Sequence, residues 1–77
     1  MARKTKEAAL ETRAQIIDAA RRVFHAEGVN RSTLDKVAKA AGVTRGAVYW
    51  HFANKAEIFL AVKQTYTSEF DQLQALL

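Results

Sequence analysis

The sequence predicts an all-α fold, made of three helices and a long fourth helix. It contains no proline, and its three glycines fall where helices can stop or must be thin. Apolar residues recur at helical spacing along most of the chain. The chain has no cysteine, and a single core of this size supplies only roughly 3 to 5 kcal/mol. We therefore expect one small domain that depends on efficient helix packing, a partner chain or a further domain.

The first helix is expected over residues 9–27. Its apolar residues follow the pattern of a helix with one buried face. They are Ile16, Ile17, Ala20, Val23 and Phe24. Gly28 comes next, where a left-handed C-terminal cap is expected.

Residues 1–8 are predicted to form a flexible basic arm. They carry positive charges at Arg3, Lys4 and Lys6 and have no apolar run to bury. The arm either trails in solvent or lies along a nucleic-acid groove.

Two short helices are expected over residues 33–41 and 45–51. Either Ser32 or Thr33 can cap the first, and Thr44 is the candidate cap of the second. Between them, Gly42 supplies a positive φ at no steric cost. Together with the first helix they predict a homeodomain-like helix-turn-helix domain over residues 9–54, whose third helix enters the major groove of DNA.

The third of these helices has two unlike faces. Val48 and Phe52 are four residues apart and share a core face, whereas Gly46 and Trp50 lie about 160° around the helix from Val48. Small residues let a helix backbone approach base edges, and an aromatic ring can pack on the sugar-phosphate chain. We therefore expect the second face to be a contact surface.

The fourth helix is expected over residues 55–77. Asn54 opens it, and Glu57 completes a pattern related to the capping box. Its outer half carries apolar residues beyond the reach of the other helices, namely Phe70, Leu73, Leu76 and Leu77. The sequence therefore predicts a piece of a longer protein whose remaining part buries them.

Composition excludes several classes of function. The net charge of +4, with its basic excess in residues 31–55 and at the N-terminal tip, suits a polyanion. With two isolated histidines and no cysteine, no metal site is expected. The sequence also lacks paired carboxylates, a Ser/His/Asp set and a phosphate-binding glycine loop, so we expect neither an enzyme nor a cofactor. Because neither a signal sequence nor a membrane span is present, we expect a cytoplasmic protein without membrane contact.

One run of residues resembles a known family. The sequence AGVTRGAVYWHF at residues 41–52, followed by Asn54 and Lys55, closely resembles the signature of the TetR family of bacterial transcriptional repressors. Residues 2–6 and 11–17 are most similar to the subgroup that represses multidrug efflux pump operons. The resemblance covers essentially the whole chain, although family members usually run to about 200 residues, a length typical of one or two domains.

The resemblance implies a role for each site residue. Base edges would be contacted by Arg45, Gly46 and Ala47, with Arg45 on guanine. The DNA backbone would be contacted by Thr33, Thr44, Tyr49, Trp50, His51 and Lys55. The arm residues Arg3, Lys4 and Lys6 are further candidates.

The resemblance also implies partners. The helix-turn-helix domain would bind double-stranded DNA at a pseudopalindromic operator. The fourth helix would lead into an absent ligand-binding domain, through which a full-length protein forms a homodimer and binds a small-molecule inducer.

Two other functions remain open at this point. The apolar stripe from Phe70 to Leu77 is also typical of a helical module that docks on a protein partner. The basic arm and the first helix are compatible with binding to an anionic lipid surface.

Overall fold

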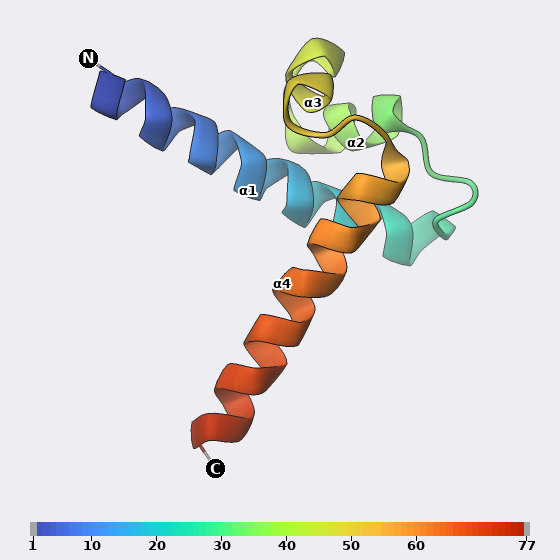
Figure 1. Ribbon diagram of the computed structural model, residues 1–77. Helices are drawn as coiled ribbons and strands as arrows, with labels where there is room; N and C mark the ends of the chain where they lie inside the picture. The colour runs from blue at the N-terminus through green and yellow to red at the C-terminus, as the bar shows by residue number, and fades with distance from the viewer. Residues whose placement is uncertain (1, 77) are drawn as a thin grey trace.

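Four α-helices run through residues 2–76, the part of the chain that the computed structural model describes, with side chains described for residues 6–76. They are α1 (Ala2–Glu27), α2 (Leu34–Ala41), α3 (Arg45–His51) and α4 (Lys55–Leu76). Figure 1 shows α1 and α4 crossing, with α2 and α3 together on one side of α1 and the outer half of α4 on the other. The predicted all-α fold is confirmed.

The first helix begins earlier than predicted. The structure is helical from Ala2, so residues 2–8 extend α1 instead of forming a flexible arm. Physically, this segment contains alanine, lysine, arginine and glutamate, which favour helices, and neither glycine nor proline. A helix that is already nucleated can add such residues without burying them. Lys6 is exposed, whereas the side chains of Arg3 and Lys4 lie outside the described part.

The core lies where α2, α3 and the first half of α4 pack on α1. Its largest fully buried side chains come one from each helix: Ile16, Val37, Val48 and Ile58. Each lies on the apolar face that helical spacing predicts. The three helices of the helix-turn-helix domain therefore share one core with the start of α4.

The connection between α2 and α3 is the tight turn expected from the sequence. Gly42 has φ 72° and ψ 29°, in the left-handed region, and its backbone N–H points to the carbonyls of Ala38 and Lys39. The N–H of Val43 donates to the carbonyl of Ala38 at 3.1 Å. These bonds satisfy carbonyls at the end of α2 and turn the chain directly into α3.

Side chains cap the starts of α2 and α4. Thr33 is the cap of α2, since its Oγ1 accepts a hydrogen bond from the N–H of Lys36 at 3.1 Å. The alternative candidate, Ser32, is buried and donates instead to the carbonyl of Gly28 at 2.6 Å. At α4, Asn54 Oδ1 accepts from the N–H of Glu57 at 3.0 Å.

The outer half of α4 stands clear of the other helices. Phe70 is 59% exposed, Leu73 63% and Leu76 83%, as the sequence predicts. Only the first half of α4 contributes to the core, through Ile58, Ala61 and Val62. None of the helices in residues 2–76 is both long and apolar enough to cross a membrane.

Candidate nucleic-acid interface

Helix α3 is fixed to the domain by its inner face and its two ends. Val48 is fully buried and Phe52, the C-cap residue, is nearly so. Thr44 caps the start, where its Oγ1 accepts a hydrogen bond from the N–H of Ala47 at 3.1 Å. A helix of seven residues is too short to be stable alone. These contacts therefore determine where its other side chains lie.

The outer face of α3, formed by Arg45, Gly46, Tyr49 and Trp50, is open to solvent. Trp50 is 75% exposed and Tyr49 is 47% exposed. Ala47 is half-buried at the edge of this face. Burial of large aromatic side chains ordinarily stabilises a small domain, so their exposure on a fixed helix favours a contact surface.

Gly46 is not required by the packing of the protein itself. A methyl group at this position would meet only Oγ1 of Thr44, at 3.9 Å. Glycine inside a helix costs about 0.5 to 1 kcal/mol relative to alanine. The residue thus lowers helix stability without relieving any internal clash, and it leaves the backbone of the outer face uncovered.

Arg45 extends from the first turn of α3 and has two neighbours. Its Nε lies 3.2 Å from Oδ1 of Asp35, at the start of α2, and its guanidinium lies over the ring of Tyr49, 5.8 Å from the ring centre. The sequence predicts roles for Arg45 and Tyr49 but none for Asp35, which lies on a different helix. Through these two contacts, Arg45 connects Asp35 on α2 with Tyr49 on α3.

Lys55 bridges the start of α4 to the loop before α2. Its Nζ donates to the carbonyl of Asn30 at 3.3 Å and to that of Ser32 at 3.1 Å. Ser32 directly precedes Thr33, so the structure brings the two predicted phosphate contacts, Lys55 and Thr33, to the same loop. The sequence did not predict these carbonyl partners.

His51 lies at the end of α3, half-buried against α1. Its ring packs edge to face against Trp50, with 4.8 Å between ring centres. Burial, together with the positive charge of Arg13 on α1, lowers the pKa of His51 below its ordinary value. Arg13 also lies over the ring of Phe52, 5.1 Å from its centre. Because the pKa is low, the imidazole is neutral near pH 7 and can donate one hydrogen bond.

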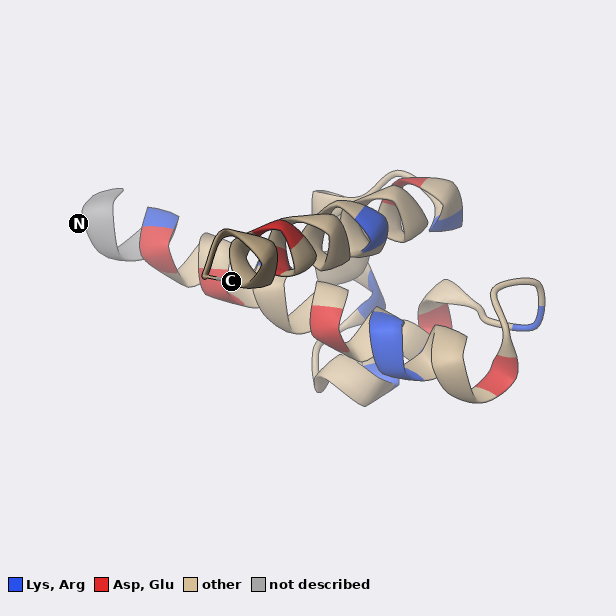
Figure 2. Ribbon diagram, turned by 90° about the horizontal axis from the view of Figure 1, so that it is seen from below, with Lys and Arg blue, Asp and Glu red and all other residues tan. Residues whose placement is uncertain are grey.

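Charged residues are spread over the fold. Figure 2 shows Lys and Arg residues mixed with Asp and Glu residues instead of gathered on one helix. Within residues 6–76, no three His, Asp or Glu side chains group so as to hold a metal ion.

Comparison with known proteins identifies similar chains. Residues 16–62 match the family described as bacterial regulatory proteins, tetR family. The transcriptional regulator TtgR of Pseudomonas putida is 56% identical over 73 residues, which cover 95% of this chain and 35% of TtgR.

Two solved structures from Pseudomonas aeruginosa are also similar. NalD, described as the secondary repressor of the MexAB-OprM multidrug efflux pump, has a TM-score of 0.72 and 47% identity over 74% of this chain and 29% of its own. MexZ, described as a key repressor responsible for antibiotic resistance, has a TM-score of 0.74 and 46% identity over 77% of this chain and 30% of its own. The chain thus spans about a third of the length of these relatives.

Proposed function

Because the chain belongs to the tetR family of bacterial regulatory proteins, we propose that it is the DNA-binding portion of a sequence-specific transcriptional regulator that represses an efflux-pump operon. The observation that carries the proposal is the outer face of α3, where an uncovered glycine backbone adjoins two exposed aromatic rings on a fixed helix. Such a face fits a groove: the backbone approaches base edges while the rings pack on sugar and phosphate.

The proposed base contacts come from Arg45, Gly46 and Ala47. Arginine makes a bidentate contact with O6 and N7 of guanine, which is the commonest specific contact in the major groove. The exposed guanidinium of Arg45 suits this role. Gly46 and Ala47 have no side chain long enough to keep the bases away from the helix.

The proposed backbone contacts surround these residues. They are Thr33, Thr44, Tyr49, Trp50, His51 and Lys55. The two threonines accept hydrogen bonds from helix N–H groups, so each hydroxyl proton can be donated to a phosphate oxygen. Lys55 donates to two carbonyls, and its ammonium has a third proton for a phosphate.

The partners of a longer chain follow from the same proposal. NalD is described as a repressor of a multidrug efflux pump, and the relatives are about three times as long as this chain. We propose that this chain likewise acts in the cytoplasm and binds an operator of pseudopalindromic duplex DNA. Homodimer formation and binding of a small-molecule inducer belong to the rest of such a protein.

A salt titration of duplex binding tests the proposal. Affinity should fall steeply as salt rises, since phosphate contacts release counterions. Arg45→Ala should cost about 1 to 3 kcal/mol and relax one base position, whereas Lys55→Ala should weaken all duplexes alike. Unchanged base preference in Arg45→Ala would show that Arg45 does not contact bases.

The exposed outer half of α4 favours a second candidate function, docking on a protein partner. Sedimentation with and without duplex DNA separates the two. A complex with a protein only, and none with duplex of any sequence, would replace the first proposal.

A further inference from the structure

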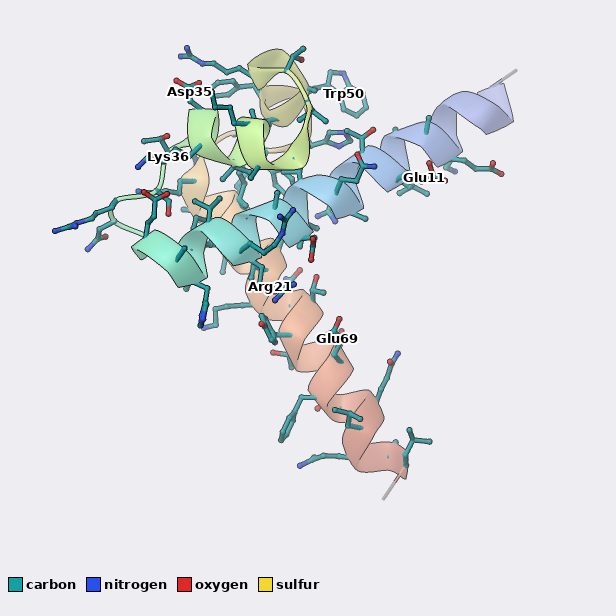
Figure 3. The ribbon with its side chains drawn as sticks, turned by 180° about the vertical axis from the view of Figure 1, so that it is seen from behind. Glu11, Arg21, Asp35, Lys36, Trp50 and Glu69 are labelled. Carbon is teal, nitrogen blue, oxygen red and sulfur yellow. The ribbon has the colours of Figure 1, made fainter. Side chains whose placement is uncertain are left out.

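One acidic side chain borders the outer face of α3. Asp35 lies in the first turn of α2, and its Oδ1 is 3.2 Å from Nε of Arg45. Figure 3 shows Asp35 and Trp50 on opposite sides of the α2–α3 unit, so the carboxylate marks the edge remote from the exposed indole. An acidic group beside the proposed DNA-binding face repels phosphates and so lowers affinity for DNA. The presence of Asp35 at this place therefore needs an explanation other than attraction to DNA.

The ion pair with Asp35 uses Nε of Arg45 and leaves the two Nη groups of the guanidinium available for other contacts. Asp35 pairs with Nε of Arg45, and the described residues offer neither Nη1 nor Nη2 a hydrogen-bond or ion-pair partner. An arginine that contacts guanine with its two Nη groups keeps its Nε edge for a protein partner. Asp35 therefore occupies the edge that base contact does not need.

A second contact restricts the same side chain. The guanidinium of Arg45 lies over the ring of Tyr49, 5.8 Å from the ring centre. The carboxylate lies at one edge of the planar group as an ion pair, and the ring lies against one of its faces. Of the many orientations open to a long exposed side chain, the two contacts favour one before any base is present.

Stability does not account for the pair. Its side chains are 65% exposed for Arg45 and 64% exposed for Asp35, and ion pairs this open contribute little to folding. The negative charge of Asp35 also interacts favourably with the positive end of the α2 dipole. This interaction does not need Arg45, so it does not explain the ion pair.

We propose that Asp35 is a positioning residue, which orients Arg45 for base contact and thereby sharpens base preference while lowering overall affinity for DNA. The inference rests on the proposed function, because it requires Arg45 to contact a base. If Asp35 only stabilised the start of α2, removal of its carboxylate would leave base preference unchanged. The positioning role predicts that base preference changes.

The experiment begins with a library of random duplexes. The unmodified chain and Arg45→Ala each enrich duplexes at low salt, and sequencing identifies the base position at which Arg45→Ala loses preference. A bidentate pair supplies about 5- to 150-fold discrimination at such a position. The same selection is then made with Asp35→Asn, and with Asp71→Asn as a control on the outer half of α4 with the same change of charge.

Asp35→Asn should reduce the preference at that position by at least about threefold, whereas affinity for a random duplex should stay equal or rise because a negative charge is lost. Asp71→Asn should leave the preference unchanged. In the double variant with Arg45→Ala, Asp35→Asn should cause no further loss, because its effect passes through Arg45.

A second variant guards against loss of folding. Asp35→Glu keeps the negative charge at the start of α2 but moves the carboxylate by one methylene group. The melting temperature of Asp35→Glu should match that of the unmodified chain. Its base preference should lie between that of the unmodified chain and that of Asp35→Asn.

Retention of full preference by both Asp35 variants would overturn the inference and leave the proposed function intact. An additive loss in the double variant would overturn it too, since Asp35 would then act without Arg45. If the unmodified chain enriches no duplex, the proposed function fails and the inference fails with it.

Discussion

Gly42 and Gly46 are four residues apart and serve different ends. Gly42 has φ 72°, where L side chains are strained, so the turn needs it. Gly46 has ordinary helical geometry and room for a methyl group. The left-handed backbone of the turn thus explains Gly42, whereas the proposed approach of the α3 backbone to base edges explains Gly46.

Gly46→Ala should affect stability and binding in opposite directions. It should raise the free energy of unfolding by about 0.5 to 1 kcal/mol, because alanine favours the helix, and it should weaken duplex binding, because the added methyl group lies between backbone and bases. Urea unfolding and a duplex titration measure the two effects.

Gly42→Ala provides the contrast, with a loss of about 1 kcal/mol or more in the free energy of unfolding from the left-handed backbone. A Gly46→Ala chain that is stabilised yet binds duplex as before would remove Gly46 from the proposed interface.

His51 should make stability depend on pH. Burial and Arg13 lower its pKa in the folded chain, whereas the unfolded chain takes up a proton near the ordinary pKa of 6.5. Stability is therefore complete above that pH and declines below it, since only the unfolded state then gains the proton readily. Between about pH 7.5 and pH 5.5, His51→Gln should lose less stability than the unmodified chain. Denaturant unfolding at several pH values measures the difference, and equal declines would contradict this account.

At the scale of helices, the caps could be predicted from the sequence because their bonds are local. Thr33 and Thr44 each accept a hydrogen bond from an N–H three residues ahead, and Asn54 does the same at α4. Helical spacing likewise separates the buried Val48 from the exposed Trp50. Patterns of three and four residues are sufficient for these features.

Contacts between helices could not be predicted in this way. Arg45 and Asp35 belong to different helices, and Lys55 lies 23 residues from Ser32. The position of Arg13 beside His51 depends on how α1 crosses α3. The observed start of α1 at Ala2 differs from the predicted start at residue 9 for another reason: a segment without a buried face can still extend an existing helix through helix propensity alone.

Lys55→Ala should loosen the link between α4 and the loop before α2. The carbonyls of Asn30 and Ser32 lose their charged donor, so the free energy of unfolding should fall by about 1 kcal/mol. Binding to all duplexes should weaken alike. Lys39→Ala is the matched control, because Lys39 is an exposed lysine on α2, and its effect on unfolding should stay within about 0.5 kcal/mol. Equal effects of the two variants on unfolding would show that the link adds no stability.

Across the whole molecule, two exposed surfaces are kept apart. The outer half of α4 extends away from the α2–α3 unit, so its apolar stripe lies far from the outer face of α3 (Figure 1). Exposed apolar stripes promote association, whereas the outer face of α3 combines aromatic rings with a charged arginine. The two surfaces can therefore be altered independently, and the core between them depends on neither.

A chain shortened to end at Ser68 tests this independence. It loses the exposed Phe70, Leu73 and Leu76 but keeps every buried residue of α4, so its free energy of unfolding should stay within about 0.5 kcal/mol of that of the full chain. Its duplex affinity should be unchanged, and its self-association in sedimentation should fall. A chain ending at Leu60 also loses Ala61 and Val62 from the core and should be destabilised by more than about 2 kcal/mol. If the two shortened chains were equally unstable, the outer half of α4 would have to take part in the fold, and the separation of the two surfaces would fail.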